Sequence, residues 1–461
     1  MSRTDPTDLA RRAFLRRSAL VGAAGAAAPW ALNLSLMADA AAAGAPGDYK
    51  ALVCVFLYGG NDQGNTLVPV DAAHHASYAA IRTGIATPLA SLQATALAPT
   101  VPLPDGLQYA LAPEMAPLKP LWDAGALAVQ LNVGPLIQPT TVAQYTARSV
   151  PLPPKLFSHN DQQSIWQSDL PEGATSGWGG RIGDLILSGN GNSVFTCVSV
   201  TGNAVYLSGR SAVQYQIGPN GAVAINGIAR SLYGSSTAQA ALRTLITQPR
   251  AHLFEDEMSR ITRRSIDAEA TVSAALASVP ALATPFDAAN PLASQLKMVA
   301  RLIAARGTLG LSRQVFMVSL GGFDLHDGLP EKHPELLARV AGAMRSFHDA
   351  TVELGVAGQV TAFTASDFGR TLSSNGDGSD HGWGSHHMVM GGAVKGRRFY
   401  GTAPAVAVNG PDDVGQGRLL PSTSVDQFGA TLATWLGVGA GDLALVVPRI
   451  GNFATRNLGF V

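Results

Sequence analysis

Charge is scarce in this 461-residue chain, and what there is cancels, because 32 Lys and Arg residues stand against 32 Asp and Glu. A net charge of zero without charge blocks argues against a nucleic acid or an anionic membrane surface as a partner. Cysteine is nearly absent, with only Cys54 and Cys197 present. Both lie in apolar, strand-like runs, where unpaired packing residues are the commoner outcome. An oxidising compartment would nevertheless permit a bridge between them.

Long hydrophobic runs and several well-known catalytic motifs are also missing. No stretch after residue 45 has the roughly eighteen unbroken apolar residues of a membrane span, so we expect the mature chain to be soluble. The sequence contains no GxSxG elbow, no phosphate-binding P-loop, no HExxH zinc motif and no dinucleotide fingerprint. None of these motifs therefore offers a competing chemistry.

The N-terminal segment has the pattern of a twin-arginine signal peptide. The run Arg11-Arg12-Ala13-Phe14-Leu15 is followed by a weakly apolar, Ala-rich region and by the small-x-small site Ala41-Ala42-Ala43. A membrane anchor is the alternative, but so many alanines make the segment too weakly apolar for a stable span. We predict that residues 1–43 are removed after passage through the twin-arginine translocase, which leaves a periplasmic or secreted protein.

Strand-like runs alternate with helical segments through the rest of the chain, which predicts one α/β domain over residues 44–461. The run Tyr49–Tyr58 is apolar throughout, as in a strand buried on both faces of a parallel sheet. Short apolar pieces broken by glycine at 202–228 indicate hairpins, within an insertion at about 202–290. Further strands are expected at 126–133, 193–200, 315–320, 360–364 and 389–394, and helices at 115–124, 161–168, 180–187, 252–279, 291–305, 334–354 and 424–436.

Three of the predicted strands end by presenting an aspartate: Asp62 after Gly59-Gly60, Asp324 after Gly321-Gly322, and Asp367. Ligands of parallel sheets bind beyond the carboxyl ends of the strands, so one edge would gather these carboxylates. Taken singly, each could equally be a turn residue or a helix cap.

Histidines accompany these carboxylates. His326 lies two residues after Asp324, and in an extended segment that spacing puts both side chains on one face, suitable for two ligands of one ion. Carboxylate with imidazole favours zinc, manganese or iron over calcium. A surface turn with an Asp–His hydrogen bond is the alternative.

A glycine-rich loop, residues 375–385, carries Asp380 and His381, and His386 and His387 follow it. Metal coordination could offset the entropy of ordering such a loop, although solvated loop histidines remain the competing interpretation. Adjacent residues of an extended chain point apart, so His386 and His387 should not share one ion.

Two further residues are candidates for catalysis. Ser158 precedes a predicted helix, where backbone N–H groups stabilise an anion. It could be a metal-activated nucleophile, or the N-cap of a capping-box-like start with Asp161. Arg370, just after Asp367, could clamp an anionic oxygen or form a surface ion pair.

Five segments together resemble one known family: LVCVFLYGGNDQGNTLVP, FSHNDQQSIWQS, GGFDLHDG, SDFGRT and DHGWGSHHMVMGGAVKG. In this order, over about residues 48–455, they are similar to domain-of-unknown-function family 1501, whose exported bacterial members are often placed beside sulfatases in the alkaline phosphatase superfamily. The resemblance implies an alkaline-phosphatase-like three-layer sandwich with a mainly parallel central sheet and a small hairpin-rich insertion.

The same resemblance implies two-metal hydrolysis of phosphate or sulfate esters. Carried onto this chain, its ligands would be Asp62, Asp324, His326, Asp367 and either His381 or His387, with Ser158 as the nucleophile. Two departures stand out: Asp324 and His326 are two apart where the superfamily pattern has four, and Phe368 stands where it has His. One metal site would then be rebuilt by Asp380 and His381, or be missing.

The sequence therefore leads to two hypotheses. The first is an exported hydrolase of small or polymeric phosphate or sulfate esters that depends on a divalent metal, zinc or manganese. The second is a phosphatase-like fold without turnover that serves as a binding or assembly factor at the cell envelope.

Overall fold

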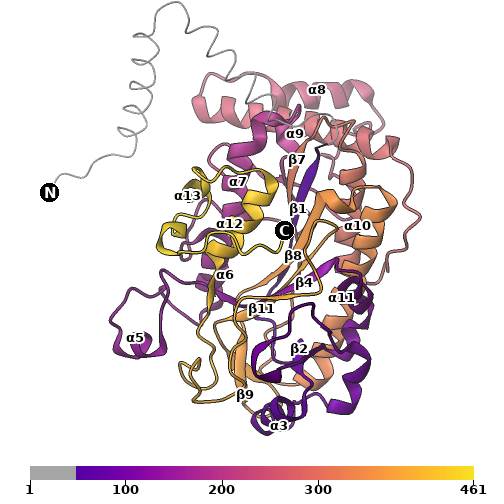
Figure 1. Cartoon of the computed structure of the whole chain (residues 1–461). Helices are drawn as coiled ribbons and strands as arrows, with labels where there is room; N and C mark the ends of the chain where they lie inside the picture. Colours follow the sequence, from indigo (N-terminus) through magenta and orange to yellow (C-terminus); the bar gives the residue numbers. More distant parts are fainter. Residues whose placement is uncertain (1–47) are drawn as a thin grey trace, which may run out of the picture. The chain divides into compact units, whose positions relative to one another are not determined.

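The apolar run predicted at residues 49–58 forms the strand β1, Lys50–Leu57, in which every residue after Lys50 is buried. The computed structural model describes residues 48–461 (Figure 1), so the predicted signal peptide lies outside the described residues. Residues Lys50–Val461 form one compact unit. Within residues 48–461 no helix is long and apolar enough to cross a membrane.

A nine-stranded sheet runs through this unit in the order β12-β4-β11-β8-β1-β7-β5-β6, with β13 beside β4. All neighbours pair in parallel except β11, which runs antiparallel to both β4 and β8. The mainly parallel α/β sheet expected from the sequence is thus confirmed. Besides β1, its strands are β4 Leu127–Gly134, β5 Cys197–Ser199, β6 Tyr215–Gln216, β7 Arg313–Leu320, β8 Val360–Ser366, β11 Ser385–Met390, β12 Phe399–Tyr400 and β13 Thr423–Ser424.

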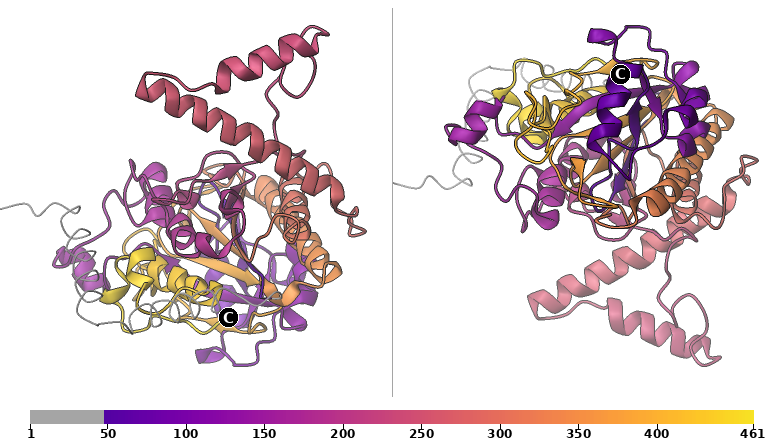
Figure 2. Two further views of the ribbon diagram at one scale, coloured as in Figure 1. Left: turned by 90° about the horizontal axis from the view of Figure 1, so that it is seen from above. Right: turned by 90° about the horizontal axis from the view of Figure 1, so that it is seen from below.

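Helices cover both faces of the sheet (Figures 1 and 2). The helices α6, α7, α12 and α13 pack on one face, and α10 and α11 pack on the other. The helices are α3 Ala72–Ile81, α4 Lys119–Asp123, α5 Val142–Ala147, α6 His159–Ser168, α7 Trp178–Ile186, α8 Ser236–Thr247, α9 Leu253–Ser278, α10 Pro291–Ala304, α11 Leu329–Glu353, α12 Val425–Leu436 and α13 Leu443–Val446. Two small antiparallel pairs complete the fold, β2 Leu67–Pro69 with β3 Tyr109–Leu111, and β9 Arg370–Ser374 with β10 Ser379–His381.

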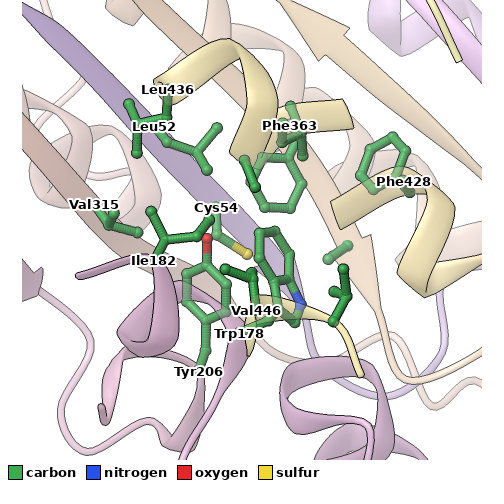
Figure 3. Close-up of a cluster of buried hydrophobic side chains, with 14 of the residues drawn as sticks. Leu52, Cys54, Trp178, Ile182, Tyr206, Val315, Phe363, Phe428, Leu436 and Val446 are labelled. Atoms are coloured by element: carbon green, nitrogen blue, oxygen red, sulfur yellow. The ribbon is translucent and has the colours of Figure 1, made fainter. Parts of the chain in front are cut away.

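Large aromatic side chains fill the core between the sheet and α6, α7 and α12 (Figure 3). Trp178 is fully buried, stacks on Phe363 of β8 and donates a hydrogen bond of 3.0 Å from its indole N–H to the Trp166 carbonyl. Removing such a ring costs about 3–5 kcal/mol of folding free energy. This packing fixes α6, and with it the residues at the N-terminus of that helix, against β8.

The two cysteines are free and buried. Cys54 on β1 and Cys197 on β5 flank β7, where they pair with Met317 and Val315. Two strand spacings, about 9.5 Å, exceed the reach of a disulfide. The fold therefore keeps the thiols apart.

Two segments differ from the sequence-based prediction. The expected hairpins of residues 202–228 reduce to one antiparallel bridge, Gly218 with Gly221, and a β6 strand that pairs in parallel with β5. The strand expected at 389–394 begins earlier, at Ser385, so that His386 and His387 lie on β11 and not in a loop. By contrast, the helix predicted at 424–436 is found as α12, which Ser424 caps through a capping box and Gly437 ends in the left-handed region.

Candidate metal centre

The neighbouring strands β1, β7 and β8 all end at one edge of the sheet, and their following residues meet there. Gly59 turns the chain after β1 with φ +115°, and a Cβ at this position would lie 2.4 Å from the backbone nitrogen of Asp324. Only glycine permits this close approach of two backbones. The Gly59 N–H also donates to Asp367 Oδ2 at 3.2 Å. The strand ends thus place Asp324 and Asp367 side by side.

Three side chains from distant parts of the chain form a group that could hold a metal ion: His159, Asp324 and His381. Their ligand atoms all lie within 4.8 Å of one another. Both imidazoles approach Asp324, because His159 Nε2 is 3.2 Å from its Oδ2 and His381 Nε2 is 3.2 Å from its Oδ1. The three residues come from the start of α6, the loop after β7 and the end of β10.

His326 adds a third imidazole nitrogen to the cluster. Its Nε2 lies 3.1 Å from Asp324 Oδ1 and 3.0 Å from His381 Nε2. Zinc–ligand bonds of 2.0–2.1 Å in a tetrahedron would separate neighbouring ligand atoms by about 3.3 Å. The distances of His326 and His381 from Asp324 Oδ1 and from each other, 3.0–3.2 Å, are therefore close to those expected around a single zinc ion.

The hydrogen bonds of His159 and His381 aim their Nε2 lone pairs into the cluster. His159 Nδ1 lies 2.7 Å from Asp367 Oδ2, and His381 Nδ1 lies 2.8 Å from the Phe157 carbonyl oxygen. Both oxygens only accept, so each Nδ1 carries the proton and each Nε2 is a free acceptor. The buried Nε2 of His159 has no hydrogen-bond partner. Carboxylate or carbonyl acceptors behind histidines are the usual second layer of a metal site.

His326 follows the same rule, since its Nδ1 lies 3.0 Å from Asp380 Oδ1. Its Nε2 then faces His381 Nε2 with a lone pair on each nitrogen. Two such lone pairs at 3.0 Å repel each other unless a proton or a cation lies between them. The cluster therefore fits a cation.

Charge around the cluster favours an ionised Asp324. Burial raises the pKa of this carboxyl, but the Arg370 guanidinium, 2.6 Å from Oδ1, and the nearby histidines outweigh burial and lower it. The hydrogen bond that His159 donates to Asp367 raises the pKa of His159, while burial lowers that of His381. The side chain of Asp324 is 44% exposed, so the cluster is open to solvent.

Arg370 is placed to hold Asp324 and not to clamp a substrate. Its guanidinium is fully buried and also donates to the carbonyl oxygens of Gly59, at 3.2 Å, and Ser379. An anion arriving from solvent would have to displace these partners.

Two predicted ligands are not brought to the cluster. Asp62 is buried, pairs with Arg82 at 2.6 Å and accepts a hydrogen bond from Ser379 Oγ at 2.6 Å. His387 is buried beside Trp166, with ring centroids 5.1 Å apart, and burial lowers its pKa to about 3. Asp367 and Asp380 reach the cluster only through the histidines that they orient.

Ser158 occupies the N-cap position of α6, but its side chain does not cap the helix. Its Oγ donates to Asp161 Oδ2 at 3.0 Å. The residues on either side, Phe157 and His159, both contact the cluster. A serine hydroxyl paired with a buried carboxylate is therefore one residue away from the candidate ligands.

His159 is a candidate ligand that the sequence patterns did not indicate. It lies inside the motif that suggested Ser158, yet the sequence contains no spacing that links it to Asp324, more than 160 residues later. The only available signal was a histidine at the start of a helix next to a candidate nucleophile.

Comparisons with known proteins give one family and several distant structures. A family model described as "Protein of unknown function (DUF1501)" matches residues 49–443. No curated protein matches the chain.

The solved structures that are similar include Ps i-CgsB in complex with k-i-k-neocarrahexaose, at 7% identity and a TM-score of 0.36, covering 88% of this chain and 77% of that one. A second structure of Ps i-CgsB has 10% identity and a TM-score of 0.35, covering 88% and 77%. A structure described under metabolism of multiple glycosaminoglycans by Bacteroides thetaiotaomicron has 10% identity and a TM-score of 0.33, covering 86% and 74%. Likeness at this level carries no argument about chemistry.

Proposed function

This chain belongs to the DUF1501 family, and on that premise we propose that it is an exported, metal-dependent hydrolase of phosphate or sulfate esters. The observation that carries the proposal is the convergence of three imidazoles on Asp324: the Nε2 atoms of His159, His326 and His381 each lie 3.1–3.2 Å from one of its carboxylate oxygens. Acceptors fix the outer nitrogen of all three imidazoles, as a metal site requires.

Imidazole and carboxylate ligands suit zinc best, with manganese as the second choice. His159, Asp324 and His381 would hold the ion, which would act as a Lewis acid on an ester oxygen. Three protein ligands leave one position of a tetrahedral ion free, as in catalytic zinc sites. The exposure of Asp324 gives a substrate access to that position.

The residues of the chain itself supply the rest of the chemistry that we propose. Ser158 is the nucleophile, and Asp161 Oδ2, 3.0 Å away, is placed to accept the hydroxyl proton. Arg370 holds Asp324 ionised and oriented. Asp367 keeps the Nδ1 proton on His159, so that Nε2 stays available.

A second candidate rests on His326. If this residue is a fourth ligand, a tetrahedral ion has no free position and the site is closed, as in structural zinc sites. The chain would then be a metal-stabilised binding or assembly protein without turnover. The variant His326→Ala separates the two: a hydrolase keeps bound metal and turnover on three ligands, whereas a closed site loses its metal.

Metal content and hydrolysis test the proposal directly. Protein exported by its native route should contain zinc or manganese and hydrolyse aryl phosphates or aryl sulfates, and His159→Ala and Asp324→Ala should lose both properties. His74→Ala is the matched control, because His74 also pairs with a carboxylate, Asp71 at 2.8 Å, but on α3. Metal-free wild type, or unchanged hydrolysis in Asp324→Ala, contradicts the proposal.

Export rests on the sequence of the first residues. Replacing Arg11 and Arg12 by lysine should retain the chain in the cytoplasm with its signal peptide uncleaved. If the variant is found in the periplasm with its signal peptide cleaved, export by the twin-arginine route is contradicted.

A further inference from the structure

The first half of α9 carries large apolar side chains in contact with solvent. Phe254 is 78% exposed, Met258 64% and Ile261 45%. Figure 2 shows α8 and this part of α9 standing away from the sheet. Exposed apolar residues that are grouped on one helix face often mark an interaction surface, whereas single scattered ones do not.

These residues belong to one continuous seam. The positions Phe254, Met258, Ile261, Ser265, Ala268, Val272 and Ala275 alternate four and three apart, which is the a/d spacing of a coiled coil. Ala268, Val272 and Ala275 are buried. The same face of α9 is therefore buried at its C-terminal end and exposed to solvent at its N-terminal end.

The helix α8 does not cover this seam. Among the other buried residues of α9, Leu276 lies near the seam at its buried C-terminal end, whereas Ser259 and Ile266 lie more than a third of a turn from the middle of the seam. Arg263, on the same far side, donates to the Thr247 carbonyl at the end of α8. Since α8 packs on the back of α9, the seam faces outward.

A groove lies at the point along α9 where the seam changes from exposed to buried. It has a volume of about 400 Å³, and its lining includes Ile261, Ser265 and Ala268 of α9 and residues 211–216. Val213 on that opposite wall is 73% exposed. An aromatic side chain from outside the molecule could enter here.

The charges beside the seam complement each other. Glu257 and Arg264 occupy equivalent positions of successive heptads, on the same side of the seam. Within residues 48–461 neither side chain has an ion-pair partner. When two such helices pair in antiparallel fashion, this position of one helix faces the same position of the other. A second copy of α9 would thus bring Arg264 to Glu257 twice.

From these features we infer that α9 mediates a symmetric dimer, an interaction surface separate from the proposed hydrolytic site. The two-fold axis passes between residues 259 and 260. Met258 then packs on Ile261 of the second copy, and Phe254 enters the groove beside Ser265 of the second copy. Apolar side chains in contact across the axis, flanked by charged pairs, are the usual anatomy of such an interface.

Charge reversal tests the pairing. Full-length mature protein should sediment as a dimer at micromolar concentration, and Arg264→Glu or Glu257→Arg alone should raise its dissociation constant roughly tenfold, because two attractive pairs become repulsive. The double variant should restore the wild-type value, since both signs are then exchanged. Ile261→Glu should give a monomer, whereas Val352→Glu, at a 55% exposed residue of α11, should leave the dimer intact.

Two outcomes would overturn the inference. The first is a monomeric wild type under these conditions. A monomer that floats with anionic lipid vesicles, and whose Phe254→Ala variant does not, would show that this surface binds a membrane instead. The second is a dimer that Ile261→Glu does not disturb. Each variant lies on an exposed position, so an unchanged melting temperature identifies effects that come from association and not from unfolding.

Discussion

Asp367→Asn should weaken metal binding without removing any ligand. Asp367 is completely buried, and its Oδ2 accepts hydrogen bonds from Gly59 N–H at 3.2 Å, His159 Nδ1 at 2.7 Å and Gln163 Nε2 at 2.7 Å. Asparagine has the same shape, and its amide oxygen can still accept from these donors. The substitution therefore removes a charge but leaves no cavity.

The expected effect follows from what that charge does to His159. The carboxylate raises the pKa of the imidazole and fixes its tautomer, so a neutral amide makes His159 Nε2 a weaker base and a worse ligand. Loss of such an orienting carboxylate lowers metal affinity roughly 10- to 100-fold. In free energy this is about 1.4–2.7 kcal/mol.

Competition with a chromophoric zinc chelator at slightly alkaline pH measures this change. Gln163→Leu is the matched control, because it removes another donor to the same oxygen but keeps the bond between His159 and Asp367. Its zinc affinity should stay much closer to wild type. Equal affinities of Asp367→Asn and wild type, or equal losses in both variants, would refute the assignment of His159 as a ligand oriented by Asp367.

Other groups give further predictions. Burial lowers the pKa of His333 to about 4 and that of His387 to about 3. In the unfolded chain both histidines take up protons below about pH 6.5, so the free energy of unfolding should fall as the pH drops from 6.5 to about 4. Each histidine should lower it by up to about 1.4 kcal/mol per pH unit. A urea midpoint that is the same at neutral and mildly acidic pH contradicts this. Arg82→Met leaves the buried Asp62 unpaired and should cost about 3–5 kcal/mol in urea unfolding; a loss below about 1 kcal/mol would mean that the carboxylate finds another partner or a proton. Ser158→Ala should abolish ester hydrolysis and keep the bound metal, and retained turnover would exclude Ser158 as the nucleophile.

The sequence predicted the parts of the fold and the site that depend on local patterns. Continuous apolar runs predicted β1, β4, β7 and β8, because strands that are buried on both faces need no polar residues. Because ligands bind beyond the strand ends, Asp324 and Asp367 were predicted to lie at one edge of the sheet. The two-residue spacing predicted that Asp324 and His326 lie together. His381, which was expected in a loop and lies at the end of β10, was also among the predicted ligands.

What sequence could not supply was the direction of individual side chains. Asp62 turns to Arg82, a residue of the far end of α3 whose buried guanidinium has no local signature. His387 was placed in a loop because the apolar run seemed to start at Val389, whereas pairing with β4 extends β11 back to Ser385. His159 enters only through the packing of α6 against β8. Each of these outcomes depends on tertiary contacts that no sequence spacing records.

The position of β7 between the two thiols bears on when and where this chain can fold. Since Cys54 and Cys197 cannot meet across that strand, the native covalent structure is the same under reducing and oxidising conditions. Folding therefore needs neither an oxidant nor a disulfide isomerase, and no mispaired thiols have to be repaired. A chain with this property can reach its final structure before it crosses a membrane and keep it unchanged on the other side.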